Sequence, residues 1–318
     1  MNNKHALCES GVQRALCEKA SVITGAPRSG TTLAGKIIST FNNVAYQFEP
    51  PSMYQIYALY ASNAISLQSA ASILRVYLSE DLLLEQAHGR GVNLRPGDDS
   101  LILNSMTWSE LLSRWQNIRN RDDAIRYIEE SGLRLVAKMP NIMDGRALIT
   151  ETSPAGKHVL VSRNGFDVIA SIVKKGWVSD EGLTNNLWPY VNTESDIPLP
   201  YWLPQEYWQQ WPQMSEFSRA SVMWIYHMEM AIAMYQDPAF NQDNLKLLNY
   251  EQLLDNPKDT VCALAEFLET ELSSLSHQRI AEIRPGRKND IPDLFKGVDS
   301  KLIDQIHHLN DELSCPVL

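Results

Sequence analysis

Cysteine is scarce in this sequence and is never paired. The 318 residues include four cysteines, Cys8, Cys17, Cys262 and Cys315, and no two of them form a C-x-x-C spacing. This pattern argues against both a disulfide framework and a zinc site, and it is typical of a reducing compartment. The sequence also lacks a run of 18 apolar residues and an apolar stretch near its start that would direct secretion. We therefore expect a cytoplasmic protein with no membrane partner and no metal site.

Basic residues are the second shortage. Lys and Arg total 28 against 38 for Asp and Glu, which gives a formal charge of −10. Such a balance argues against a phosphate backbone as the main partner, so we expect a small-molecule substrate and no nucleic acid. At 44% hydrophobic and 21% charged, the chain can bury a large core, and we treat residues 1–318 as a single domain.

Short apolar runs alternate with helical patterns along the chain. Runs rich in β-branched residues occupy 20–26, 133–139, 157–162 and 245–250, and each is followed by apolar residues at helical spacing. Residues 52–131 are mostly helical in pattern, with a break near 89–99, and further helices are predicted at 214–235 and 301–313. Strands that alternate with helices indicate an α/β fold, with a parallel β-sheet flanked by helices.

A glycine-rich loop follows the first predicted strand and opens a helix. It reads Gly25-Ala26-Pro27-Arg28-Ser29-Gly30-Thr31-Thr32. Backbone N–H groups at a helix N-terminus bind phosphate, which makes this a P-loop-like anion site, although the alternative is a tight turn without a ligand. Thr31 stands where a P-loop carries lysine, which weakens the reading as a P-loop kinase or NTPase. A non-catalytic nucleotide-binding protein is the other alternative.

The loop resembles the phosphosulfate loop of the sulfotransferases that use 3′-phosphoadenosine-5′-phosphosulfate (PAPS), and residues 158–171, with Trp177 beyond them, resemble the strand and helix of that family that bind the 3′-phosphate. The departure is Asn164-Gly165-Phe166, where the family usually has Asp-Pro-Arg. The resemblance implies a P-loop-like α/β fold, PAPS as co-substrate and its desulfated product 3′-phosphoadenosine 5′-phosphate (PAP). It also implies a set of nucleotide contacts: Pro27, Arg28, Ser29, Gly30, Thr31 and Thr32 at the loop, and Arg163 and Ser171 at the 3′-phosphate.

Three further segments extend the resemblance. Lys138 lies in a Lys-x-Pro strand end that faces the nucleotide in many relatives, and residues 247–257 resemble a Tyr-Glu-Asp-Leu segment that we interpret as structural. The basic loop 284–288 resembles one that closes over PAPS, so Arg287 and Lys288 are candidate nucleotide contacts. A solvated basic turn is an equally good interpretation of that loop.

Glu49 is the candidate general base. It lies in a Phe-Glu-Pro segment that resembles one in carbohydrate sulfotransferases, whose glutamate lies beside the transferred group. Arg28 and Lys138 complete the predicted catalytic set, because sulfuryl transfer needs positioning and charge stabilisation. A glutamate that caps a helix is the alternative for Glu49. His88, His158 and His227 are rival bases, although a histidine on an apolar helix is more often a core residue.

Residues 176–218 form a segment of unusual composition, with six acidic residues, five of the eight tryptophans and no Lys, Arg or His. We expect an aromatic-rich insert on the acceptor side, a lid in which Trp177, Trp188 and Trp202 join Glu49 in binding the acceptor. Tryptophan faces and carboxylates favour a cation, such as a guanidinium alkaloid of secondary metabolism. The alternative is an aromatic mini-core with a solvated acidic face. The function predicted is transfer of a sulfuryl group from PAPS to a hydroxyl or amine of a small molecule.

Overall fold

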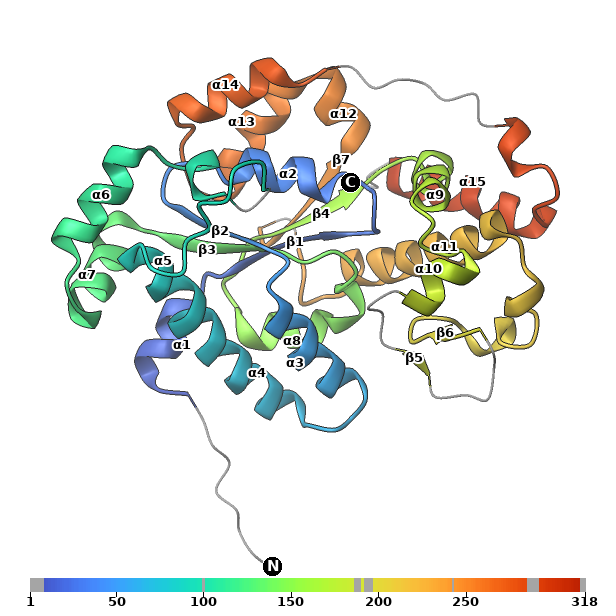
Figure 1. Cartoon of the computed structure of the whole chain (residues 1–318), viewed down its shortest axis with the longest axis horizontal. Coiled ribbons are helices and arrows are strands. Elements are labelled where there is room, and N and C mark those ends of the chain that lie inside the picture. Colours follow the sequence, from blue (N-terminus) through green and yellow to red (C-terminus); the bar gives the residue numbers. More distant parts are fainter. Residues whose placement is uncertain are drawn as a thin grey trace, which may run out of the picture.

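The computed structural model describes residues 9–98, 101–185, 190–191, 197–241, 243–284 and 292–314. Five parallel strands form its central sheet, in the order β2-β3-β1-β4-β7 (Figure 1). Their bounds are β1 Ser21–Gly25, β2 Val44–Phe48, β3 Arg134–Lys138, β4 His158–Ser162 and β7 Leu245–Asn249. Strand β1 is therefore central, and the registers Ile23 to Lys138 and Ile23 to Val159 align it with both neighbours.

Helices cover both faces of the sheet, which explains why β1 and β4 are buried at every position. Helices α2, α13 and α14 lie on one face, over a cluster that includes Ile23, Val136 and Val161. Helices α3, α4, α8, α9, α11 and α15 lie on the other face, where they form the larger core (Figure 1).

The helices of the described residues have the following bounds: α1 Gly11–Cys17, α2 Thr31–Ile38, α3 Pro51–Ala61, α4 Leu67–Val76, α5 Glu85–His88, α6 Trp108–Asn117, α7 Arg121–Ser131, α8 Arg146–Thr152, α9 Gly165–Lys174, α10 Asp180–Asn185, α11 Glu216–Tyr235, α12 Tyr250–Asp255, α13 Pro257–Phe267, α14 Ser274–Glu282 and α15 Ser300–Ser314. A π-helical segment, Tyr77–Leu84, joins α4 to α5, and a 3₁₀ turn, Met143–Gly145, precedes α8.

The α/β architecture predicted from the sequence is confirmed, as are the four predicted strands and the helical region with its break. Strand β2 was not predicted. It contains the polar residue Gln47, lies at the edge of the sheet and becomes more exposed towards Phe48, so it lacks the continuous apolar run of a central strand. The omission matters because Glu49 directly follows β2.

The insert at 176–218 is anchored to α11 by a buried arginine. Arg219, whose side chain is 3% exposed, donates hydrogen bonds to the carbonyl oxygens of Trp211 (3.0 Å), Val178 (3.0 Å) and Pro212 (2.9 Å), and it pairs with Asp180. Within the insert, β5 (Tyr190–Val191) pairs antiparallel with β6 (Leu199–Pro200). The described part of the insert is therefore an ordered segment that packs on the larger core.

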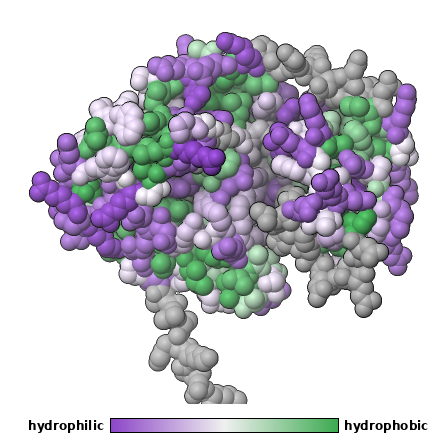
Figure 2. Space-filling model, viewed as in Figure 1, coloured by the Kyte–Doolittle hydropathy of each residue, from purple (hydrophilic) through white to green (hydrophobic). Residues whose placement is uncertain are grey.

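The surface carries no single apolar band on the face shown in Figure 2, where hydrophobic residues emerge in separate patches among hydrophilic ones. Within the described residues, every helix is too short or too polar to span a bilayer.

Candidate active site

The candidate site lies at the carboxyl ends of the parallel strands. Gly25, Phe48, Lys138, Ser162 and Asn249 end β1, β2, β3, β4 and β7 on the same edge of the sheet. The strands that follow β1 lie on both of its sides, so this edge contains the crevice at which open α/β sheets bind ligands. The loops that leave these ends carry the residues that the sequence singled out.

The glycine-rich loop turns sharply between β1 and α2. Its backbone is left-handed at Arg28 (φ 68°) and at Gly30 (φ 105°), and the N–H of Ser29 donates to the carbonyl of Ala26 at 3.1 Å. Pro27, Ser29 and Thr31 are buried, and Ser29 Oγ has no hydrogen-bond partner among the residues that the structure describes. A turn of this shape aims backbone N–H groups outward at the start of a helix, which suits an anionic ligand.

Arg28 lies beside the residues predicted to bind the 3′-phosphate. Its side chain is exposed, and its Nε donates to Ser171 Oγ at 3.1 Å, while its guanidinium lies 5.7 Å from the centre of the Trp177 ring. Arg163 Nη1 donates to the carbonyl of Arg28 at 3.3 Å. Arg28 of the loop is therefore in contact with three residues of the segment 163–177.

Tyr250, which we interpreted from the sequence as part of a structural segment, belongs to the same group. The Arg163 guanidinium lies 4.5 Å from the centre of the Tyr250 ring, a cation–π distance. The same ring lies against Gly30, so closely that a Cβ atom at that position would come within 2.7 Å of Tyr250 Cε2. The order of motifs in the sequence does not predict this contact. The loop follows β1 and α12 follows β7, and only the fold brings the two segments together.

Asn164 gives the departure from the family pattern a local explanation. Its side chain caps α9 by accepting from the N–H groups of Phe166 and Asp167, and its own N–H donates to Glu251 at 3.0 Å. A Cβ atom at Gly165 would lie 2.6 Å from the Trp224 ring, so the position favours glycine. The segment therefore ends β4 and starts α9 without the proline of the usual pattern.

Lys138 and Glu49 form an ion pair on the other side of the loop. Lys138 is 3% exposed, and its Nζ also donates to Thr32 Oγ1 at 3.0 Å and lies 4.1 Å from the Phe48 ring centre. Glu49 remains partly exposed and has a left-handed backbone, with φ of 45°, and its N–H donates to the Lys138 carbonyl at 3.0 Å. Strained backbone at a strand end is a frequent mark of functional residues.

The rival histidines are all buried. His158 begins β4 at the edge of the sheet opposite the loop, and its Nδ1 accepts from the N–H of Val22 at 3.2 Å. Burial lowers the pKa of His158 to about 4 and that of His227 to about 3, and burial is also the main reason for the lowered pKa of His88. Of the four candidate bases, Glu49 alone is shown in contact with Lys138.

The predicted acceptor contacts lie in different environments. Trp177 is half-buried beside Arg28, whereas Trp202 is 3% exposed and packs edge-on against Trp211, at a centroid distance of 5.8 Å. The position of Trp202 is that of a core residue, as the mini-core alternative expects. Trp188 lies outside the described residues, as do Arg287 and Lys288 of the basic loop.

A group of tyrosines around Asp144, one of them from the insert, was not predicted from the sequence. The hydroxyls of Tyr57 and Tyr226 both donate to Asp144 Oδ2, the latter at 3.1 Å, and the Tyr57 and Tyr201 rings meet edge-on at 6.4 Å. Burial raises the pKa of Asp144. These residues come from α3, the 3₁₀ turn, the insert and α11, so only the fold brings them together.

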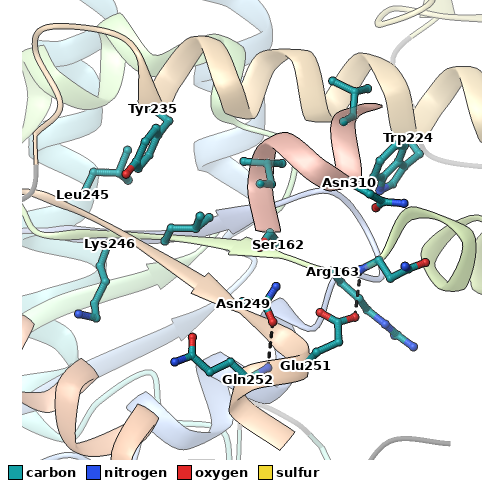
Figure 3. A pocket seen from close by; sticks show the side chains of 14 residues that line it. Ser162, Arg163, Trp224, Tyr235, Leu245, Lys246, Asn249, Glu251, Gln252 and Asn310 are labelled. Atoms are coloured by element: carbon teal, nitrogen blue, oxygen red, sulfur yellow. Dashed lines mark hydrogen bonds between the residues drawn. The ribbon is translucent and has the colours of Figure 1, made fainter. Parts of the chain in front are cut away.

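A cavity of about 710 Å³ borders Arg163 and runs along β7 (Figure 3). Figure 3 shows Tyr235 and Lys246 at one end, and Trp224 and Asn310 at the other. Ser162 also lines it.

A family model described as "Sulfotransferase domain" matches residues 18–284 of the chain. The chain belongs to the sulfotransferase domain family. No curated protein matches the sequence of this chain significantly. Among solved structures, it is similar to the sulfotransferase domain from the curacin biosynthetic pathway, with 13% identity, coverage of 94% of this chain and 99% of that one, and a TM-score of 0.50. It is also similar to sulfotransferase STF9 from Mycobacterium avium, with 10% identity, coverage of 96% and 79%, and a TM-score of 0.50.

At these identities the likeness concerns the fold, and the family assignment comes from the domain match. The kinase or NTPase alternative is not favoured by any of these comparisons. Thr31, at the position of the P-loop lysine, agrees with that outcome.

Proposed function

We propose that this sulfotransferase moves the sulfuryl group of PAPS to a hydroxyl or amine of a small-molecule acceptor. The supporting observation is the convergence of two groups at one edge of the sheet. Arg28, Arg163 and Ser171 lie on one side of the glycine-rich loop, and Lys138 and Glu49 lie on the other. This arrangement offers a place for a nucleotide with two anionic ends, next to a carboxylate that can take a proton.

The residues present suit PAPS as co-substrate. The loop N–H groups, the buried Ser29 hydroxyl and the start of α2 would hold the 5′-phosphosulfate, while Arg163 and Ser171 would hold the 3′-phosphate. Arg287 and Lys288 remain proposed contacts on sequence grounds. PAPS supplies a sulfuryl group whose bond to the 5′-phosphate oxygen is broken in the reaction.

In the proposed reaction, Glu49 accepts the proton of the acceptor hydroxyl or amine as the new bond to sulfur forms. Arg28 and Lys138 stabilise the negative charge that develops on the phosphate oxygen released from sulfur. The contact of Lys138 with both Glu49 and Thr32 holds the base beside the loop. In kinases, magnesium neutralises the negative charge that develops on the phosphate oxygens. In the proposed reaction arginine and lysine do so, and no metal is required.

We further propose that the insert forms part of the acceptor pocket and that the acceptor is cationic, as a guanidinium alkaloid is. Trp177 lies beside Arg28, which supports a place for the insert near the reacting group.

Calorimetric titration with PAP, with and without a chelator, tests the nucleotide assignment. We expect the same affinity in both conditions, and strict dependence on magnesium would refute the assignment. A mass-shift screen for products that gain SO₃, run with PAPS and a small-molecule collection, tests the transfer. If the protein binds PAP but gives no product with any acceptor, a non-catalytic nucleotide-binding protein is favoured.

A further inference from the structure

The carboxylates in the described part of the insert are poorly placed to hold a cationic acceptor. Glu181, Glu206 and Glu216 are exposed on the surface, and Asp180 is already paired with Arg219. A charge that faces solvent or is neutralised by a neighbour adds little to binding. A carboxylate elsewhere on the acceptor side must therefore be considered.

Asp144 is such a carboxylate, because it is half-buried and no ion pair within the described residues neutralises it. Arg146, the closest arginine along the chain, pairs with Asp237 at 2.9 Å. Lys138 and Arg219 are likewise paired with Glu49 and Asp180. Asp144 Oδ2 accepts hydrogen bonds from the hydroxyls of Tyr57 and Tyr226, and the buried Oδ1 has no hydrogen-bond partner among the described residues.

The tyrosines around Asp144 connect it to the proposed base. Tyr54 and Tyr57 lie one turn apart on α3, which begins just after Glu49. The charge of Glu49 contributes to the raised pKa of Tyr54, and the charge of Asp144 contributes to the raised pKa values of Tyr57 and Tyr201. The Tyr54 hydroxyl donates to the carbonyl of Pro140 at 3.1 Å, two residues beyond the Lys138 that pairs with Glu49, while Tyr57 donates to Asp144. Helix α3 therefore contacts both the strand end that carries the ion pair and the Asp144 cluster.

The cluster lies close to the surface, because Asp144, Tyr54, Tyr201 and Tyr226 are each half-buried. Tyrosine faces attract cations, and a carboxylate gives a cationic N–H donor a charge-assisted hydrogen bond. A neutral ligand gains neither contribution in full.

We infer that Asp144, framed by Tyr57, Tyr201 and Tyr226, binds the cationic group of the acceptor while Glu49 receives the proton of its nucleophile. This specificity rests on the proposed sulfuryl transfer. It assigns the enzyme acceptors that carry a protonated amine or guanidinium in addition to the reacting hydroxyl or amine, and it gives the insert a part in recognition through Tyr201.

Tyramine and 4-ethylphenol form a matched pair of probes, because they share a phenol and differ by one ammonium group. We would titrate each into PAP-loaded protein by calorimetry and measure kcat/KM for each with PAPS. We expect wild-type protein to bind tyramine about 10- to 150-fold more tightly, the range of one charge-assisted hydrogen bond. Asp144→Asn should remove this preference and leave the affinity for PAP and for 4-ethylphenol unchanged. Glu181→Gln, an exposed carboxylate of the insert, is the control and should keep the preference.

The results separate this inference from the proposed function. If PAP binds and wild-type protein does not prefer tyramine, or if Asp144→Asn retains the preference, the role of Asp144 is wrong and the proposed transfer stands. If PAP does not bind, the proposed transfer fails, and the inference fails with it. The wild-type comparison needs no variant to fold, and Asp144→Ser replaces Asp144→Asn if the amide variant is unstable, as judged by its PAP affinity.

Discussion

Gly30→Ala should couple the glycine-rich loop to the 3′-phosphate site through Tyr250. A Cβ atom at position 30 would overlap the Tyr250 ring, and this ring lies under the guanidinium of Arg163. The left-handed backbone at φ 105° costs an alanine about 1–2 kcal/mol, and overpacking adds about 1–3 kcal/mol. We therefore expect about 2–5 kcal/mol of lost unfolding free energy and, because Arg163 loses its support, about 10- to 150-fold weaker PAP binding.

Gly132→Ala is the matched control. Gly132 also has a positive φ, of 66°, but a Cβ atom there would meet no atom within 4 Å. This variant should lose only the backbone contribution, about 1–2 kcal/mol, and keep its affinity for PAP. Urea unfolding and calorimetry with PAP measure the two quantities for each variant.

A double-mutant cycle separates the ring overlap from the backbone strain. In a Tyr250→Ala background, Gly30→Ala should cost no more than Gly132→Ala does in the wild type, since the overlapping ring is gone. Wild-type PAP affinity in Gly30→Ala, or a cost that is the same with and without the Tyr250 ring, would refute the coupling.

Three further outcomes concern other groups of the site and core. Arg163→Ala should weaken PAP binding about 10- to 150-fold by calorimetry, and an unchanged affinity would place the 3′-phosphate elsewhere. Glu49→Gln should lower kcat about 10²- to 10⁴-fold with nearly unchanged PAP affinity, whereas near-wild-type turnover would exclude Glu49 as the base. His158 and His227 have lowered pKa values, so the unfolded chain takes up protons that the folded one does not. Stability should be full above about pH 6.5 and fall by about 1.4 kcal/mol per pH unit for each histidine as the pH drops towards 4. Urea unfolding at several pH values measures this slope, and His227→Gln should reduce it; an unchanged slope would contradict the assignment.

The parallel sheet could be predicted because the burial of its central strands is visible as short apolar runs in the sequence. β1 and β4 each contain consecutive apolar residues, and the chain order of loop, strand end and helix placed Arg28, Arg163 and Ser171 on one edge. Strand β2 could not be predicted in this way. An edge strand is held by one neighbour, so its pattern can remain half polar.

Residues that act through distant contacts escaped the sequence for a different reason. Asp144 belongs to no sequence motif. The tyrosines around it are Tyr57, Tyr201 and Tyr226, which are far apart in the sequence and are brought together only by the fold. Tyr250 had a motif, but its ring serves the loop of a different strand. A sequence pattern reports the local structure of a residue and gives little information about the partner that the fold supplies.

The place of Glu49 at the end of an edge strand has a consequence for heat inactivation. Among the described strands, β2 is paired with β3 alone, whereas β1 and β4, which precede Arg28 and Arg163 in the chain, are paired on both sides. Edge elements open at a lower free-energy cost than the whole domain. With Glu49 as the proposed base, mild warming would stop turnover reversibly, by separating Glu49 from Lys138, while nucleotide binding and circular dichroism still report a folded protein. Engineering for heat tolerance would gain most from fastening β2 to β3, because the buried core would not be the first part to fail.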